Sequence, residues 1–162
     1  MSADRVLAWF DTTKKNNTRG PLILAGTVGT GKSHIACGLL RGWIEQLRKP
    51  GYYTTASEYA RDIRSTWNRD SEVTERAVMR RPIEAPLLVL DDLGAGKAQD
   101  VELLQELICA RYDDEAMGTL IVSTNLAPKV WAQTFGERVT DRLREGATLF
   151  EMTGQSLRRP AA

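Results

Sequence analysis

A short run of residues near the N-terminus could bind the phosphate groups of a nucleotide. The run matches the pattern G-x-x-x-x-G-K-[ST] and consists of Gly26, Thr27, Val28, Gly29, Thr30, Gly31, Lys32 and Ser33. Glycines let such a backbone curl, so that its amide groups point at phosphate oxygens. In these loops the lysine reaches the β- and γ-phosphates, and the serine hydroxyl binds magnesium. The run therefore predicts a site for ATP and Mg²⁺, rather than a glycine-rich turn beside an exposed lysine.

A pair of acidic residues directly follows an apolar run that is typical of a buried strand. The run covers 87–90, and Asp91 and Asp92 come next. Carboxylates at the end of a buried strand are costly unless a cation or another partner faces them. The magnesium ion of the nucleotide would be that cation, so we assign Asp91 to the metal, directly or through water. Asp92 then polarises the attacking water; a solvated turn is the alternative if the pair is considered alone.

An amide side chain follows another apolar run in the same way. The run covers 119–123, and Thr124 and Asn125 come next. A neutral amide at this place can orient the hydrolytic water or contact the γ-phosphate. An Asx-turn leading into a helix at Pro128 is the alternative, and it would be favoured if the segment stood alone. Together with the two preceding motifs, the segment predicts that Asn125 senses the nucleotide.

Arginines gather in the C-terminal part of the chain. Arg138, Arg142 and Arg144 fall in one segment, and Arg158 and Arg159 lie near the end. Arginines that stabilise charge during phosphoryl transfer can be supplied by a neighbouring subunit. A solvated helix face followed by a basic tail explains the same residues, and this alternative is favoured on the residues alone.

The elements that must position these side chains alternate between strands and helices. Apolar runs predict strands at 21–25, 52–55, 87–90, 119–123 and 147–152. Helices are expected over 1–10, from Lys32 to the break at 50–51, from Asp100 onward, and from Pro128 to about Arg144. A further helix is expected after a cap at Ser57, with Tyr59, Ile63 and Trp67 on its inner face. This alternation implies an α/β sandwich around a parallel sheet. In such sheets ligands sit beyond the carboxyl ends of the strands, where the first three motifs lie.

Composition sets bounds without pointing to a partner. The 162 residues fit one domain, and 22 basic against 21 acidic residues give a net charge of +1, which implies no overall attraction to nucleic acid or membrane. Cys37 and Cys109 fall in apolar stretches, so we expect small buried residues rather than a disulfide or a metal pair. We find no membrane-spanning run and no signal peptide, and we therefore expect a cytoplasmic protein.

The order of the motifs resembles the AAA+ ATPases of the DnaC/IstB type, which are bacterial and phage replicative-helicase loaders and their transposition-helper relatives. The segments 26–36, 87–94, 123–126 and 137–143 carry the resemblance, which extends over about 19–159. It implies a P-loop NTPase (AAA+/ASCE) fold of the α/β class, a three-layer α-β-α sandwich with a mostly parallel five-stranded sheet. Helicase loaders of this family usually carry an N-terminal segment that grips the helicase. We see no such segment here, and we therefore expect a single AAA+ ATPase domain over 1–162, without a separate N-terminal helicase-binding domain.

The resemblance assigns further roles to single residues. The phosphate loop resembles Walker A, the pair Asp91 and Asp92 resembles Walker B, and Asn125 resembles sensor 1. Arg142 resembles an arginine finger that reaches the ATP of the next subunit, which implies a homo-oligomer, and Arg138 is a possible second arginine of this kind. Arg158 resembles the sensor 2 arginine, which contacts the γ-phosphate in its own subunit.

The family's activity implies ATP hydrolysis, weak without an oligomer or DNA, and the loading of a replicative helicase onto single-stranded DNA. An IstB-like helper that delivers a transposase, and an ATP-dependent scaffold with negligible turnover, are the alternatives. Family members bind single-stranded DNA between the two Walker motifs, where we expect contacts from Arg61, Arg64 and Trp67. A solvated face is the alternative, because the neighbouring charges nearly cancel: Arg69, Arg76, Arg80 and Arg81 against Asp62, Asp70, Glu72 and Glu75.

Overall fold

The computed structural model describes residues 3–16, 20–68, 70–97, 99–113 and 118–157. Its elements in chain order are α1 (Ala3–Asn16), β1 (Leu22–Gly26), α2 (Lys32–Leu47), β2 (Tyr52–Thr55), α3 (Ala56–Ser65), α4 (Glu75–Glu84), β3 (Leu87–Leu93), α5 (Asp100–Asp113), β4 (Thr119–Thr124), the 3₁₀ helix η1 (Pro128–Val130), α6 (Trp131–Arg144) and β5 (Thr148–Met152). The five predicted strands are present, and β3 continues through the acidic pair. The first helix is longer than predicted, and α4 lies in a segment for which no element was expected.

The strands form one sheet with the order β2-β3-β4-β1-β5, and each neighbouring pair is parallel. The predicted five-stranded sheet is confirmed, and among the described strands it is parallel throughout. Continuous apolar runs favour this arrangement, because strands of parallel sheets are buried on both faces. Since the strands point the same way, their carboxyl ends meet at one edge. The ends of β1, β3 and β4, which carry the three predicted motifs, therefore lie together.

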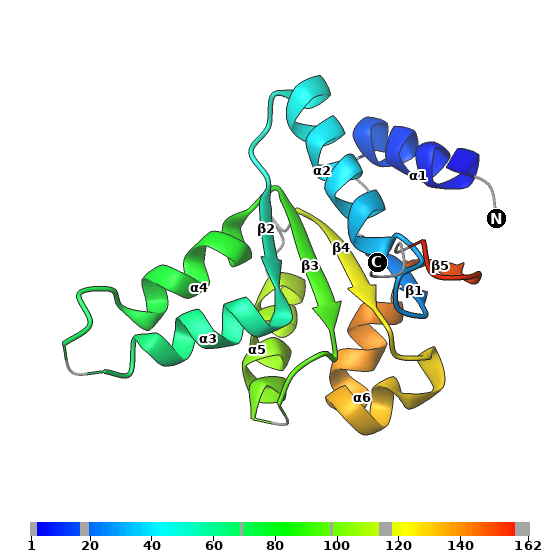
Figure 1. The fold of residues 1–162 in the computed structure, drawn as a ribbon. Coiled ribbons are helices and arrows are strands. Elements are labelled where there is room, and N and C mark those ends of the chain that lie inside the picture. Colours follow the sequence, from blue (N-terminus) through cyan, green and yellow to red (C-terminus); the bar gives the residue numbers. More distant parts are fainter. Residues whose placement is uncertain (1–2, 17–19, 69, 98, 114–117, 158–162) are drawn as a thin grey trace, which may run out of the picture.

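Helices cover both faces of the sheet and give the expected three layers (Figure 1). α1 and α2 pack on one face, where Phe10 and Trp43 join buried strand residues such as Val89. α3, α5 and α6 pack on the other face, where Ile63 and Phe135 are fully buried. Within the part of the chain that the structure describes, no helix has the length and apolarity needed to cross a bilayer.

α3 and α4 form an arm that projects from the side of the sheet carrying β2 (Figure 1). The predicted cap of α3 was Ser57, but the helix is capped two residues earlier, by Thr55. The Thr55 hydroxyl accepts from the backbone N–H of Glu58, and the Glu58 carboxylate accepts from the N–H of Thr55, which forms a capping box. Ile63 is buried as predicted. The prediction that Trp67 faces inward is wrong, because α3 ends before it and its side chain is 60% exposed.

Both cysteines are free, but their surroundings differ from the prediction. Cys37 is exposed and Cys109 is half-buried, so the interpretation of Cys37 as a small buried residue is wrong. The buried side of α2 carries Ala36, Leu39 and Trp43. Successive helical residues are turned by about 100°, so Cys37 falls outside the stripe that begins at Ala36.

A fully buried arginine at the end of α5 holds the arm against the sheet. The guanidinium of Arg111 donates to backbone carbonyl oxygens at 2.5 to 3.2 Å, those of Pro82, Ile83, Ala85, Gly118 and Thr119. The first three belong to the end of α4 and the turn after it, where helix carbonyls lack backbone partners and carry partial negative charge. The buried cation is therefore compensated by carbonyl groups, and it joins α4, α5 and the start of β4.

Replacing Arg111 by methionine should destabilise the fold, because methionine fills part of the space and leaves these carbonyl oxygens without their donor. We expect a loss of about 3 kcal/mol, which lowers the Tm of a domain of this size by roughly 6–12 °C. Thermal unfolding followed by circular dichroism measures the change. Arg41→Met is the matched control, because Arg41 is exposed on α2 and pairs only with Glu45 among the described residues. A Tm for Arg111→Met equal to that of the control would contradict the assignment.

Candidate functional site

The predicted phosphate loop occupies the turn between the end of β1 and the start of α2. Gly29 and Gly31 have φ angles of 84° and 92°, in the left-handed region that favours glycine. Gly31 precedes the first turn of α2, so the unpaired amides of that turn point into the loop. A Cβ added at Gly29 would lie 2.1 Å from Oγ of Ser156, so glycine is also required by space. Local sequence thus builds a helix N-terminus suited to an anion.

Lys32 places an ammonium group inside this loop. It is the first residue of α2 and is buried. Its Nζ donates to the carbonyl oxygens of Gly26 at 3.0 Å and Thr27 at 2.8 Å. The hydroxyl of Thr30 donates to the same Thr27 oxygen at 2.9 Å, which holds the loop closed around the lysine. The loop therefore presents its cation where phosphate oxygens would be bound.

Asp91 and Asp92 sit at an irregularity between β3 and β4. The register shifts between Leu90 and Leu93, where β3 holds one residue more than β4. Asp92 adopts a φ of 55°, a left-handed conformation that aspartate tolerates better than most residues. The hydroxyl of Ser123 accepts from the backbone N–H of Asp92 at 2.9 Å and donates to Oδ1 of Asp91. As a result, the Asp91 carboxylate is buried, whereas Asp92 is half-buried at the edge of a cavity.

A tyrosine that sequence reasoning treated only as a strand former also binds Asp91. The phenol of Tyr53 donates to Oδ2 of Asp91 at 2.7 Å. Burial and this hydrogen bond raise the pKa of Tyr53 well above its usual range, so the phenol remains protonated and donates. Partial desolvation of the sulfur, followed by the charge of Asp91, also raises the pKa of the Cys37 thiol, although the residue as a whole is exposed. Tyr53 carries no motif in the sequence, and its contact depends on how β2 pairs with β3.

Residues from each of the first three predicted motifs line one cavity of about 410 Å³ at the carboxyl ends of the strands. Its lining consists of Val28, Gly29, Gly31, Lys32, Ser33, His34, Asp92, Asn125 and Leu157. The turn after β4 uses Thr124, whose hydroxyl accepts from the N–H of Leu126 at 3.0 Å and donates to the carbonyl of Leu93 at 2.7 Å. Thr124 thus shapes the turn, and Asn125 next to it is exposed and lines the cavity.

The C-terminal segment returns to the phosphate loop immediately before Arg158. The backbone N–H of Leu157 donates to the carbonyl oxygen of Gly29 at 2.9 Å, and Leu157 contributes to the cavity lining. Arg158 itself lies outside the described residues, so its sensor 2 role stays a prediction. The path of the chain nevertheless brings the residue before it to the phosphate loop.

Magnesium fits this site together with nucleotide phosphates. The described residues contain no cluster of three or more His, Cys, Asp or Glu side chains that could hold a metal ion. In nucleotide sites Mg²⁺ needs one or two protein ligands, because phosphates and waters supply the rest. Ser33 lines the cavity, and Asp91 provides a fixed carboxylate beside Asp92. These oxygen donors suit Mg²⁺ bound with the phosphates.

Arg142 lies at the opposite end of the sheet from the phosphate loop. It lines a hollow of about 360 Å³ with Pro21, which directly precedes β1. β1 has five residues and separates the two places by roughly 15 Å. The guanidinium donates to Oδ1 of Asp113 at 2.7 Å and stacks on Tyr112 at 4.9 Å, and Arg138 reaches the same Asp113 at 3.8 Å. Arg142 therefore cannot contact phosphates bound by its own loop.

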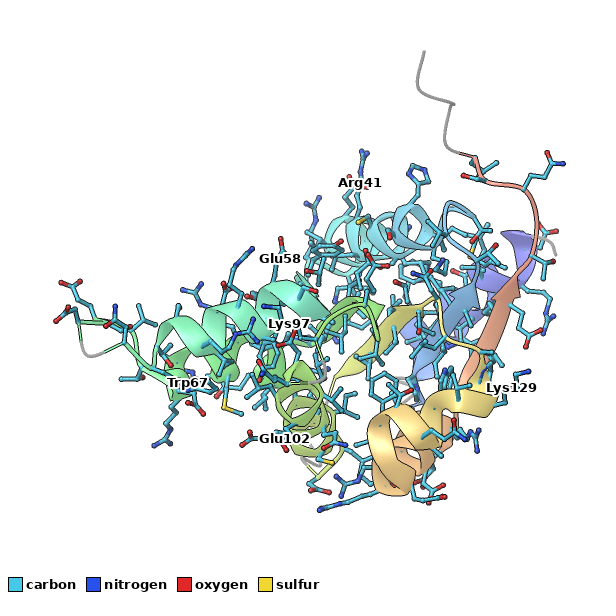
Figure 2. All side chains as sticks on the ribbon, turned by 60° about the horizontal axis from the view of Figure 1, so that its bottom comes forward. Arg41, Glu58, Trp67, Lys97, Glu102 and Lys129 are labelled. Atoms are coloured by element: carbon cyan, nitrogen blue, oxygen red, sulfur yellow. The ribbon has the colours of Figure 1, made fainter. Side chains whose placement is uncertain are left out.

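The three residues predicted to contact DNA differ in their surroundings. Arg61 is exposed on α3, whereas Arg64 pairs with the buried carboxylate of Asp100 at the start of α5. Trp67 lies on the projecting arm, and its indole N–H donates to Glu75 at 2.8 Å (Figure 2). The structure thus presents Arg61 and Trp67 at the surface and uses Arg64 to tie the arm to α5.

A family model described as "IstB-like ATP binding protein" matches residues 3–161. The replicative helicase loader DnaC of Buchnera aphidicola subsp. Baizongia pistaciae is 27% identical over 136 residues, which are 83% of this chain and 54% of that protein. An insertion sequence ATP-binding protein of Sinorhizobium fredii is 28% identical over 148 residues, which are 87% of this chain and 47% of that protein. The chain thus spans about half the length of these curated relatives.

Solved structures show the same fold. A crystal structure of the DnaC helicase loader aligns with a TM-score of 0.78 at 22% identity and covers 93% of this chain and 89% of that one. The replication initiator DnaA, bound to AMPPCP and single-stranded DNA, aligns with a TM-score of 0.74 at 19% identity and covers 96% of this chain and 48% of that one. The fold is therefore that of P-loop AAA+ proteins. With the family match extending over 3–161 and the motifs gathered at one cavity, this chain belongs to the IstB-like ATP binding protein family.

Proposed function

We propose that this chain binds and hydrolyses ATP with Mg²⁺ and acts in DNA replication as a DnaC-like helicase loader on single-stranded DNA. The observation that carries the ATPase function is the cavity lined by Lys32, Ser33, Asp92 and Asn125, with the buried Asp91 beside it. Hydrolysis of a nucleotide needs a phosphate cradle, metal ligands and a group that acts on water. These side chains supply each of those parts.

Each residue has a role that suits its surroundings. The loop amides and Lys32 bind the β- and γ-phosphates, and Ser33 and Asp91 hold the magnesium, which neutralises charge on the phosphates when bound. The burial of Asp91 and its two hydroxyl donors suit a carboxylate that keeps one orientation. Asp92 lines the cavity, so it can accept a hydrogen bond from the attacking water, and Asn125 can orient that water from the end of β4.

The position of Arg142 supports hydrolysis between subunits of a homo-oligomer. Because Arg142 lies at the far end of the sheet from its own phosphate loop, we propose that it completes the ATP site of a neighbouring subunit. Arg138 is the second candidate. Both arginines reach Asp113 within this chain, so Arg142 would exchange that carboxylate for the γ-phosphate of the neighbour.

The projecting arm and the relatives support a role on DNA. Arg61 and Trp67 offer an exposed cation and an exposed aromatic ring, which together suit single-stranded DNA. Similarity to a replicative helicase loader favours a replicative helicase as partner. Similarity to an insertion sequence ATP-binding protein favours the second candidate, a transposition helper with a transposase as partner. Pull-down from host lysate with ATP and Mg²⁺ distinguishes the two functions, because a helicase loader should recover a replicative helicase and a transposition helper should recover a transposase.

The two aspartates should separate binding from hydrolysis. Asp92→Asn should retain ATP binding and lose about 10²–10⁴-fold in turnover, because an amide polarises water poorly. Asp91→Asn should instead weaken nucleotide binding when Mg²⁺ is present. Titration of a fluorescent ATP analogue in Mg²⁺ and in EDTA, with phosphate release measured in parallel, tests both. Lys32→Ala is the control that should lose binding or hydrolysis. Equal losses of binding in the two aspartate variants would overturn the division of roles.

Removal of the Arg142 guanidinium should leave ATP affinity unchanged and abolish most turnover. A finger arginine supplied in trans is worth about 10³–10⁵ in rate, or roughly 4–7 kcal/mol of barrier. The turnover of the parent per chain should rise with protein concentration. Mixed Lys32→Ala and Arg142→Ala chains should recover activity, because some interfaces pair an intact loop with an intact arginine. No recovery at concentrations where the parent oligomerises would remove Arg142 from the mechanism.

Two exposed residues of the arm should govern affinity for single-stranded DNA. Trp67→Ala should weaken binding by about 1–3 kcal/mol if one base stacks on the ring. Arg61→Gln should reduce the slope of log affinity against log salt by about 0.7, the value for one phosphate contact. Fluorescence anisotropy of a labelled oligothymidine at several salt concentrations measures both. Arg41→Gln, an exposed arginine on α2, is the control (Figure 2). Parent-like binding of both arm variants would place the DNA contact elsewhere.

A further inference from the structure

Two hydroxyl groups hold the buried carboxylate of the acidic pair from opposite oxygens. Ser123 donates to Oδ1 of Asp91, and Tyr53 donates to Oδ2 at 2.7 Å. Ser123 belongs to a predicted motif, whereas Tyr53 belongs to none. We propose that Tyr53 is a positioning residue for magnesium binding, acting through Asp91. The inference rests on the proposed Mg²⁺-dependent binding and hydrolysis of ATP.

The pairing of β2 with β3 explains why a tyrosine can reach this carboxylate. Thr55 is the direct partner of Asp91, and Tyr53 is the partner of Val89. Tyr53 therefore stands two residues before the partner of Asp91, on the same face of the sheet, because side chains alternate along a strand. Neighbouring strands lie about 4.8 Å apart and two residues advance about 6.6 Å along a parallel strand, so these diagonal neighbours are roughly 8 Å apart at Cα. The tyrosine side chain is long enough to span that distance, and its hydroxyl lies within hydrogen-bond distance of Oδ2 of Asp91.

The Tyr53 hydroxyl fixes the orientation of the Asp91 carboxylate, which Ser123 alone does not fix. A carboxylate held at one oxygen can still rotate about its Cβ–Cγ bond, whereas donors on both oxygens fix the plane of the group. An ionised carboxylate has about four acceptor sites, so the two hydroxyls leave sites for a metal ion or its water. Ser123 already accepts the N–H of Asp92, which ties its own orientation to the backbone. Tyr53 therefore supplies the restraint on Asp91 that comes from the other side of the carboxylate.

Because Tyr53 lies on an edge strand, its hydroxyl can be removed with little effect on the packing of the sheet. β2 is one of the two edge strands of the sheet, and Tyr53 is 37% exposed. Tyr53→Phe removes the hydroxyl and keeps the ring. Tyr52 provides the matched control: it lies on the same strand, and its side chain packs against the hydrophobic cluster on the opposite face of the sheet. Tyr52→Phe therefore makes the same chemical change next to the same backbone without touching Asp91.

The test is a Mg²⁺ titration of nucleotide binding, followed with a fluorescent ATP analogue. Loss of the groups that orient a metal-binding side chain typically costs 10–100-fold in metal affinity or activity. Tyr53→Phe should therefore need about tenfold more Mg²⁺ or above for half-maximal binding, with affinity in EDTA equal to that of the parent. Tyr52→Phe should match the parent in both conditions. A Mg²⁺ requirement of Tyr53→Phe equal to that of Tyr52→Phe would overturn the inference.

A double variant distinguishes positioning from a general structural role. In an Asp91→Asn background, Tyr53→Phe should cause little further change in the Mg²⁺ requirement, because its effect passes through the carboxylate. Full additivity of the two changes would overturn the inference. Ser123→Ala removes the other donor and should shift the Mg²⁺ requirement in the same direction. Tyr53→Leu, which also lacks the hydroxyl, repeats the test if Tyr53→Phe folds poorly, and a parent-like Mg²⁺ requirement in that variant would again overturn the inference. Absence of Mg²⁺-dependent binding in the parent would instead refute the proposed function, and is thus distinguishable.

Discussion

The hydroxyl of Ser123 joins the two acidic residues of the site, and the geometry of the cavity depends on that link. It accepts from the backbone of Asp92 and donates to the carboxylate of Asp91, where β3 carries one residue more than β4. The irregularity sends one carboxylate into the protein and the other to the cavity. β4 also pairs with β1, with Ser123 opposite Leu24, so the same strand holds the phosphate loop at a set distance from both aspartates. A buried carboxylate is costly without donors, which explains why hydroxyls surround Asp91.

In the parallel sheet, the residues of the proposed ATP site lie at the carboxyl ends of the strands, and the proposed arginine finger lies at their amino ends. Loops that follow strands lie at the carboxyl edge, and the last turn of a helix that leads into the next strand lies at the amino edge. The phosphate loop and Asn125 belong to the first group, and Arg142 at the end of α6 belongs to the second. An arginine placed in this way can act on a nucleotide only across a subunit boundary. The topology alone therefore makes assembly a requirement of the proposed arginine finger.

α5 contacts both the arm and Arg142. At its start, Asp100 pairs with Arg64 of α3, and near its end Arg111 binds the carbonyl groups after α4. Its last residues, Tyr112 and Asp113, hold Arg142. The surface proposed for DNA and the arginine proposed for the neighbouring subunit are thus attached to one helix.

The fold class, the strand positions and the phosphate loop could be predicted from the sequence, because apolar runs, glycine spacing and motif order are local properties. The acidic pair and Asn125 were singled out for the same reason, because each comes at the end of an apolar run in the sequence. Contacts between distant segments were not predictable, because they depend on strand register and helix packing. Tyr53 meets Asp91 only through the pairing of β2 with β3, and Trp67 is exposed only because α3 ends before it. Local residue patterns therefore identified the phosphate loop, the acidic pair and Asn125, whereas strand register and helix packing set which side chains contact one another and brought Tyr53 to Asp91.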